Sequence, residues 1–233
     1  MDWVGPAVTA AVVSGIISIV SLFIGRSTTL ITHRQKLDAD RQLAERKVEA
    51  DIALARAKFE YDREQAIFKR KFELAEHMLS DAYQLRSLME YVRNGFSFSG
   101  EATSRVSDGA EREEIKRLRD SYFVPQARLQ AENKFLSNML ARRTACHAHF
   151  GLEADKAFEL FHQSLHQTRV ASQLLVEWTA PGEDVDKETM NNLKADIWKG
   201  YAEHKGKDNI GRKIEEAVGI CEKLCQPVLG SSV

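Results

Sequence analysis

The sequence predicts an all-α protein with one N-terminal transmembrane helix, a long cytoplasmic helix with 11-residue repeats, and a C-terminal helical bundle. Ala, Leu, Glu, Lys, Arg and Gln dominate the 233 residues, and only four residues are proline, which is a helical composition. An uncharged run lies near the N-terminus, and a stretch with period eleven follows it. The 33 basic and 34 acidic residues nearly balance, so nucleic acid is not expected as a partner.

The uncharged run covers residues 3–25. As a helix it would measure about 34 Å, enough for a hydrocarbon core of roughly 30 Å. A secretory signal would begin with a basic region and end in a small-residue cleavage site, and this run has neither. Residues 1–29 are therefore predicted to form an uncleaved membrane anchor. The alternative is a buried core helix, which is disfavoured because soluble helices seldom lack a polar face over six turns.

The flanking charges predict the orientation of the anchor. No Lys or Arg precedes the run, and six follow within about twenty residues, namely Arg26, Arg34, Lys36, Arg41, Arg46 and Lys47. The N-terminus is then expected outside the cell membrane and the C-terminal domain in the cytoplasm. The three cysteines, an odd number, agree with a reducing compartment.

Small residues line one face of the anchor. Ala7, Ala11 and Gly15 are spaced four apart, as are Ala10, Ser14 and Ser18 on a neighbouring face. This spacing lets two helix backbones approach closely, so Ala7, Ala11 and Gly15 are candidate contacts between copies. The alternative is that small residues are simply common in membrane helices.

Three eleven-residue units run from Lys36 to Phe68: KLDADRQLAER, KVEADIALARA and KFEYDREQAIF. Eleven residues make three turns at 3.67 residues per turn, so a stripe of side chains stays nearly parallel to the helix axis. The front stripe comprises Leu37, Arg41, Ala44, Val48, Ile52, Ala55, Phe59, Arg63 and Ala66. The back stripe comprises Ala39, Leu43, Ala50, Leu54, Tyr61 and Gln65. Each unit also places Lys four residues before Asp, a spacing that favours an ion pair along the helix.

Two narrow, Ala-rich stripes on opposite faces predict neighbours on both sides of a helical rod over residues 30–71. This pattern favours a homo-oligomer, either a bundle or a ring of several copies. Its candidate contact residues are Leu37, Val48, Ile52, Ala55 and Phe59. Two alternatives remain open. One is a solitary charged stalk in solvent; the other is an amphipathic helix on the membrane surface, which is ranked last because its apolar face is split in two.

From Lys69 onward the apolar face widens, which predicts burial in a globular domain over residues 72–233. The widened face comprises Phe72, Leu74, Ala75, Met78, Leu79, Ala82, Leu85, Leu88, Met89 and Val92. The helix should end at Asn94-Gly95, before a polar loop over 95–109 that is either anchored by Phe96 and Phe98 or disordered. Further helices are expected over about 110–149 (with a kink or restart at Pro125), 152–178, 187–204 and 210–225, with a turn at 181–184. Together they predict an up-and-down bundle.

Candidate ligands for a metal are sparse. His162 and His166 are four residues apart, as are Cys221 and Cys225, and Cys146 stands beside His147. The four-residue spacing suits two metal ligands on a helix. However, cysteine is a common core residue, and the HEXXH carboxylate and the two-residue Cys spacing are both missing. No metal, cofactor or catalytic site is therefore expected, and the chain is not expected to be an enzyme.

These features predict a membrane-tethered, self-associating scaffold or adaptor that presents its bundle to a partner. The expected partners are the lipid bilayer, further copies of the chain, and an unidentified cytoplasmic protein. The alternative is an oligomeric membrane effector or pore former triggered through the bundle. For that function, Ser14, Ser18 and Ser21 supply only a faint polar lining.

Overall fold

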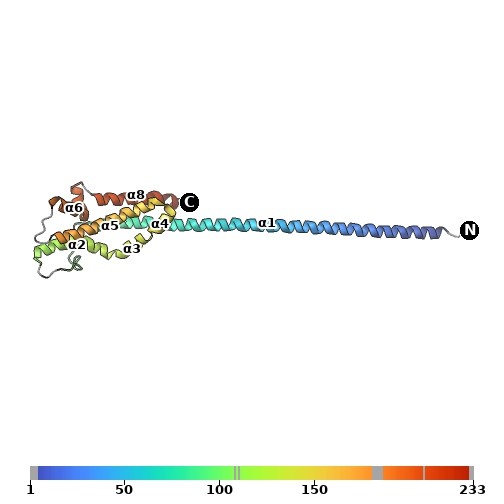
Figure 1. The fold of residues 1–233 in the computed structure, drawn as a ribbon, viewed down its shortest axis with the longest axis horizontal. Coiled ribbons are helices and arrows are strands. Elements are labelled where there is room, and N and C mark those ends of the chain that lie inside the picture. Colours follow the sequence, from blue (N-terminus) through green and yellow to red (C-terminus); the bar gives the residue numbers. More distant parts are fainter. Residues whose placement is uncertain (1–4, 108, 110, 180–185, 207, 231–233) are drawn as a thin grey trace. The chain divides into compact units, whose positions relative to one another are not determined.

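All the regular secondary structure in the described part of the chain is helical, which confirms the all-α class (Figure 1). The computed structural model describes residues 5–107, 109, 111–179, 186–206 and 208–230, without the side chains of residues 6, 7 and 9. The helices are α1 (Pro6–Val92), α2 (Glu113–Ala131), α3 (Asn133–Ala141), α4 (Arg143–Phe150), α5 (Leu152–Trp178), α6 (Lys187–Ile197), α7 (Lys199–His204) and α8 (Asn209–Leu229). The chain divides into two compact units, Met1–Ala66 and Ile67–Val233.

The first unit is helical from Pro6 onward, and every residue from 10 to 66 is exposed. Within the described residues, the segment Ala10–Val92 holds an 18-residue window of mean hydropathy 1.8, long and apolar enough to cross a membrane. The helix continues without a break through Ser27, Thr28 and Thr29. The hydroxyls of Ser27, Thr28 and Thr29 donate to carbonyls four residues back, at 2.8, 2.6 and 2.6 Å, so the backbone accommodates these polar side chains without a break.

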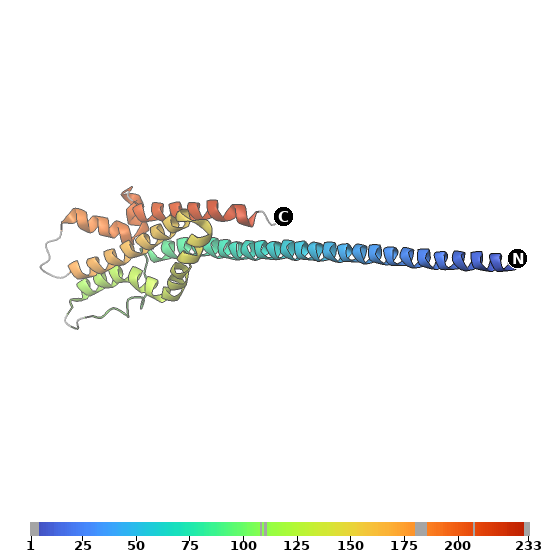
Figure 2. The same cartoon turned by 45° about the vertical axis from the view of Figure 1, so that its right-hand side comes forward.

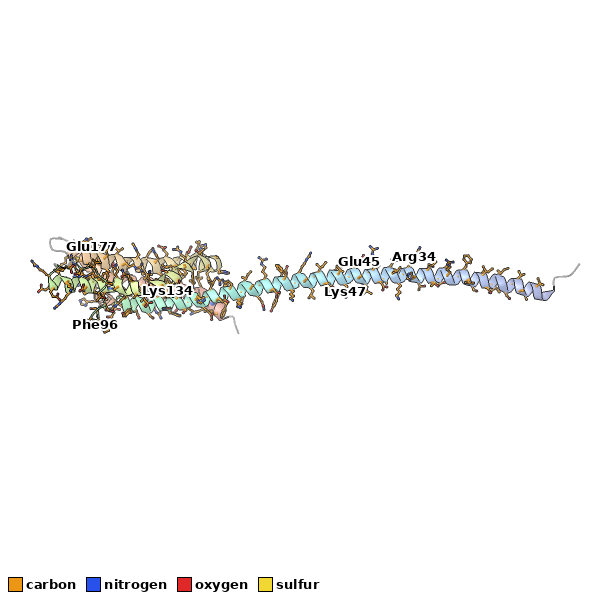
Figure 3. The ribbon with its side chains drawn as sticks, turned by 90° about the horizontal axis from the view of Figure 1, so that it is seen from below. Arg34, Glu45, Lys47, Phe96, Lys134 and Glu177 are labelled. Carbon is orange, nitrogen blue, oxygen red and sulfur yellow. The ribbon has the colours of Figure 1, made fainter. Side chains whose placement is uncertain are left out.

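The side chains of the repeat point outward all along the helix, as Arg34, Glu45 and Lys47 show in Figure 3. Arg41 and Glu45 form an ion pair at 3.0 Å. The expected Lys–Asp pairs are not formed, and that prediction was wrong. Among the described residues, no ion pair joins Lys36 to Asp40, Lys47 to Asp51 or Lys58 to Asp62. Exposed pairs of long side chains gain little in water, so these charges remain available.

The second unit is an up-and-down bundle of four segments (Figure 2). The end of α1 runs one way, α2–α4 return, α5 runs out again, and α6–α8 return. Side-chain pairs establish the antiparallel order. Tyr83 donates to Glu222 while Arg93 pairs with Asp208, so α1 and α8 run in opposite directions. Helix α5 is central and packs against α2, α4, α6 and α8.

The apolar face predicted for the end of α1 enters the core. Leu74, Ala75, Met78, Ala82, Leu85, Met89 and Val92 are buried, and Phe72, Leu79 and Leu88 are half-buried. They meet Leu129 and Met139 from α2 and α3, Phe158 and Phe161 from α5, and Ile214 from α8. A smaller cluster joins Tyr122, Ala171, Leu175 and Ile197. Burial of these apolar surfaces is the main source of stability for a bundle of this kind.

The helix predicted over 110–149 was expected to kink or restart at Pro125, and this position of the break is wrong. Pro125 lies buried inside α2, and the breaks fall instead at Glu132 and Arg142. At both breaks the chain changes direction (Figure 2), which lets Leu136 and Cys146 reach the same core. A proline is tolerated where the surrounding packing compensates for the lost backbone bond.

Other boundaries differ less. Helix α5 matches the predicted range, because Gly151 before it adopts φ 75°, a conformation that favours glycine. The predicted helix over 187–204 is interrupted at Trp198, which is extended (φ −125°, ψ 111°). Helix α8 continues past Cys225 to Leu229, with Pro227 in its last turns. The turn expected at 181–184 lies outside the described residues.

The loop after α1 is held by arginines rather than by its phenylalanines. Phe96 and Phe98 are 83% and 74% exposed, so they do not anchor it. Arg128 instead donates to the carbonyls of Asn94 and Phe96 at 3.1 and 2.7 Å. Arg128 also pairs with Glu101 at 2.8 Å. A buried guanidinium needs several acceptors, and this loop supplies them as backbone carbonyls.

A second cluster closes the other end of the loop. The half-buried Glu111 accepts from Arg105 at 2.7 Å and from Arg119. The hydrogen bond from Arg105 lowers the pKa of Glu111 from 4.5 to about 2, against the opposing effect of burial. Arg105 also pairs with Asp120 at 2.6 Å. The carboxylate is therefore stabilised in its charged form.

Glu111 makes the stability of the bundle depend on pH. A depressed pKa in the folded state contributes stability above the unfolded pKa, and this contribution is lost as pH falls from about 4.5 toward about 2. Glu111→Gln should lower stability at neutral pH and flatten its decline between those two pH values. Urea denaturation at a series of pH values measures both effects. Glu113→Gln, at an exposed carboxylate paired with Arg117, is the control and should leave the slope unchanged. An unchanged slope in Glu111→Gln would refute this role.

Candidate binding cleft beside helix α7

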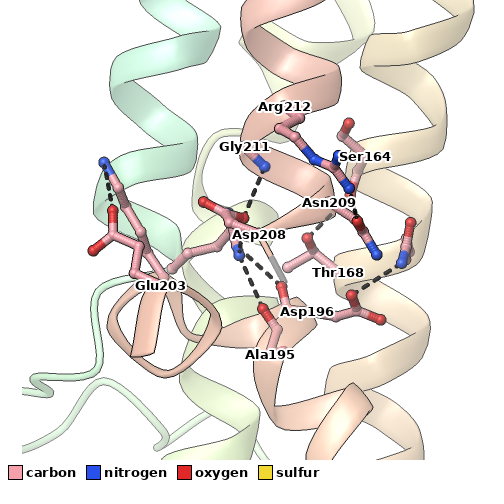
Figure 4. A network of polar contacts seen from close by, with 12 residues as sticks. Ser164, Thr168, Ala195, Asp196, Glu203, Asp208, Asn209, Gly211 and Arg212 are labelled. Carbon is pink, nitrogen blue, oxygen red and sulfur yellow. Dashed lines mark hydrogen bonds and ion pairs between the residues drawn. The ribbon is translucent and has the colours of Figure 1, made fainter. Parts of the chain in front are cut away.

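Arg93 takes part in a polar network where α1 ends, and Figure 4 shows its partners Ala195, Asp196 and Asp208. The residue is only 2% exposed. Its guanidinium donates to the carbonyls of Ala195 and Asp196 at 2.9 and 3.1 Å and pairs with Asp208 at 2.8 Å. Its own carbonyl accepts from the backbone N–H of Lys199 at 2.9 Å. One residue therefore joins α1 to the α6–α7 junction and to α8.

Asp208 connects this arginine to the first turn of α8. Its side chain accepts from the backbone N–H of Gly211 at 2.9 Å, which caps the helix. A Cβ atom at Gly211 would overlap the Asp208 carboxylate, so glycine is required at this position while Arg93 holds the acid. The carboxylate therefore serves both as a counter-ion and as a helix cap.

Two adjoining hollows of about 430 and 730 Å³ lie beside this network. They share Glu90, Arg93, Lys199 and Glu203. The first reaches toward α8, with Met89 and Ile214 in its wall. The second reaches toward the loop after α1, and Phe96, Trp198 and Tyr201 line it. We call the two hollows together the α7 cleft.

The charges around the α7 cleft are largely neutralised by one another. Lys199 pairs with Glu90 at 3.0 Å, and this hydrogen bond raises the pKa of Lys199. Arg86 approaches Glu215 at 3.7 Å. Deeper in the network, burial raises the pKa of Asp196, while a hydrogen bond from Gln167 opposes that shift. Apolar and aromatic walls framed by paired charges are typical of a surface that receives apolar side chains.

The residues predicted as contacts between copies lie on the exposed first unit. Val48, Ile52 and Phe59 are 56%, 47% and 71% exposed, and Leu37 and Ala55 are exposed too. Ala11 and Gly15 are likewise exposed in the anchor segment, while the side chain of Ala7 lies outside the described part. These residues are therefore open to a neighbour, and they are not drawn into the α7 cleft.

The histidines of α5 and the three cysteines, which were weighed as metal ligands, lie in different parts of the bundle. His162 and His166 are stacked on the exposed side of α5 with ring centroids 6.2 Å apart, whereas Cys146, Cys221 and Cys225 are buried in the main core. Burial raises the pKa of Cys146 to about 11 and that of Cys225 to about 12, so both remain unreactive thiols. Within the described residues, no three His, Cys, Asp or Glu side chains converge to hold a metal ion.

The sequence analysis did not identify the arginines that organise the bundle. The sequence predicted no role for Arg93 or Arg128, although each adjoins a buried apolar residue, Val92 and Leu129 respectively. The signal that could have revealed Arg93 is its place four residues after Met89, on the core face of the helix. A charge at a core position implies a buried partner.

No protein-family model, curated protein or solved structure matches this chain. The class of protein is therefore argued from its fold and surfaces alone: an all-helical protein with a long exposed apolar helix and a bundle that carries the α7 cleft.

The role of Arg93 can be tested by truncation. Arg93→Ala would leave the Asp208 carboxylate and two carbonyls without their donor, and breaking a buried ion pair in this way costs about 3–5 kcal/mol of unfolding free energy. Urea denaturation followed by tryptophan fluorescence measures the loss, since Trp198 lies at the same junction. Arg212→Ala, at an exposed arginine bonded to Asn209, is the control and should change stability by less than about 0.5 kcal/mol. Equal stability of the two variants would show that Arg93 does not hold the junction.

Proposed function

We propose that the protein is a membrane-tethered scaffold that self-associates through the exposed part of α1 and presents its bundle to a cytoplasmic partner. The observation that carries this proposal is the exposure of every residue from 10 to 66 on an unbroken helix. Many of these exposed residues are large and apolar. Contiguous exposed apolar surface marks a contact with lipid or with protein. In this helix the uncharged N-terminal part suits lipid, and the repeat that follows suits protein.

The N-terminal part of the helix has the properties of a membrane anchor. Its apolar window satisfies the length and composition needed for a span. The hydroxyls of Ser14 and Ser18 donate to the carbonyls of Ala10 and Ser14, each at 2.8 Å. Polar groups satisfied inside their own helix are compatible with the hydrocarbon core.

The repeat region has the properties of an assembly surface. The exposed front-stripe residues Val48 and Ile52 contribute roughly 1.5–3 kcal/mol each when fully buried. Alanines at Ala44, Ala55 and Ala66 separate the larger side chains and permit close approach of a neighbouring helix. A stalk in solvent would gain nothing from these apolar positions, so their presence supports association between copies.

Anchoring and orientation can be tested in cells. Deleting residues 1–25 should release the protein from the membrane fraction, because the only window apolar enough for a span in the described chain lies in this helix. A reporter enzyme fused after Val233 should be active in the cytoplasm, because the basic residues all follow the span. A truncated protein that still sediments with membranes would show that the repeat itself binds lipid. A signal from outside the cell would reverse the orientation.

Self-association can be tested by placing charge in the front stripe. Val48→Asp combined with Ile52→Asp should convert an oligomer of the full chain in detergent into monomers, because charge is costly to bury without a partner. Light scattering coupled to size exclusion gives the mass, and circular dichroism should show that the helix content is retained.

The matched control places the same two charges outside both stripes. Gln42→Asp combined with Ala53→Asp changes two exposed residues that share position 7 of the repeat, and it should leave the oligomer intact. A wild-type protein that is monomeric at tens of micromolar would refute self-association. An oligomer that survives Val48→Asp with Ile52→Asp would place the contact elsewhere in the chain.

A further inference from the structure

We propose, on the basis of the self-association proposed above, that the partner of the front stripe is the back stripe of the next copy, so that the helices close into a ring. In this arrangement every copy contacts one neighbour through its front stripe and the other neighbour through its back stripe. All copies point the same way, because one membrane anchor precedes every helix. The contact lies wholly within the repeat over residues 36–66.

The angle between the two stripes carries the first part of the argument. With eleven residues in three turns, each residue advances about 98° around the axis. The centres of the front and back stripes are then separated by about 130–147° on the side that carries the Lys and Asp positions. A symmetric pair of helices needs one contact face, and a heterologous ring needs two. Two faces at this angle close a ring of roughly seven to eleven copies.

Charge complementarity carries the second part. Asp40, Asp51 and Asp62 flank the front stripe, and Lys36, Lys47 and Lys58 flank the back stripe on the same side of the helix. When a front stripe meets a back stripe, the Asp row of one copy therefore faces the Lys row of its neighbour in all three repeats. Rows of opposite charge beside an apolar seam select partner and orientation.

The structure shows that these charges are free for such contacts. In the described chain each Lys and Asp of the three pairs is exposed, and none of the three pairs closes along its own helix. Arg41 and Glu45, which have the same four-residue spacing, do form their pair. The repeating Lys and Asp therefore have no ion-pair partner along their own helix and can pair with a neighbouring copy.

A two-copy complex leaves this pattern unexplained. If two front stripes packed together, the back stripe and the whole Lys row would remain in water in every repeat. Exposed Leu43, Leu54 and Tyr61 would then have no neighbour. In the ring, both stripes are covered and the Lys and Asp rows face the central space, where water can reach them.

Cysteine cross-linking of the full chain in native membranes distinguishes the two arrangements. Val48 and Ala50 lie at nearly the same height on opposite stripes, and both are exposed. Val48→Cys combined with Ala50→Cys, oxidised by air with a copper catalyst, should give a ladder of disulfide-linked species reaching roughly seven to eleven copies. Either single substitution should give no cross-link, because like positions do not meet. The native cysteines are buried, so the unsubstituted protein is the background control.

The outcomes separate the ring from self-association as such. A dimer band from Val48→Cys alone would overturn the ring and establish a front-to-front pair, with the proposed scaffold function intact. No cross-link in any variant would also overturn the ring. If, in addition, the wild type is monomeric by light scattering, the proposed self-association is refuted as well.

A charge exchange tests the contact between the two rows. In the cross-linking background, Lys47→Asp alone or Asp51→Lys alone would set like charges against each other at every junction, and each should lower the cross-linked fraction by roughly twofold or more. The double variant restores opposite charges across the junction and should recover the ladder. Ladders unaffected by the single variants would overturn the pairing of the rows. Glu49→Lys, at an exposed position outside both rows, is the control.

Discussion

A buried guanidinium group must find acceptors for its N–H donors, because an unpaired charge in the interior costs several kcal/mol. In this bundle that requirement explains why helices end where they do. Arg93 takes two carbonyls from the end of α6 and one carboxylate from the start of α8. Helix α6 therefore stops at Ile197, Trp198 becomes extended, and α8 begins beside Asp208. The α7 cleft is the hollow left beside this junction, so its walls depend on the same arginine.

Arg128 has the corresponding role on the other side of the α1 terminus. It donates to the carbonyl of Tyr91 at the end of α1 and to that of Phe96 in the loop, pairs with Glu101, and lies over the ring of Tyr91, 4.4 Å from its centroid. Helix ends leave carbonyls without intrahelical donors, and here Arg128 donates to the carbonyl of Tyr91 while Arg93 donates to those of Ala195 and Asp196. The loop that follows can then expose Phe96 and Phe98 without losing its conformation. Phe96 thus lies at one edge of the cleft with its side chain exposed and its carbonyl bonded to Arg128.

The parts of the fold that depend on periodicity were predictable from the sequence. The bounds of α5 and the core face of α1 follow from the spacing of apolar residues. The breaks at Glu132, Arg142 and Trp198 were not predictable, because long-range packing and hydrogen bonds set them rather than local propensity. Pro125 shows the reverse, a strong local signal that the core overrides. The α7 cleft was missed for a related reason, since its organising residue is a charge that looks solvent-exposed in sequence. The two stripes of the repeat stay a prediction, whereas the ion pairs expected along the helix did not form.

The three buried thiols have a practical consequence. Cys146 and the pair Cys221 and Cys225 come from different helices, α4 and α8, yet they share one region of the core. Burial keeps them both shielded and protonated, so a thiol reagent can modify them only during moments when the bundle opens. When opening and closing are fast compared with modification, the labelling rate reports the free energy of that opening. The three thiols are therefore an intrinsic probe of local opening. They report on the bundle separately from the helix that precedes it.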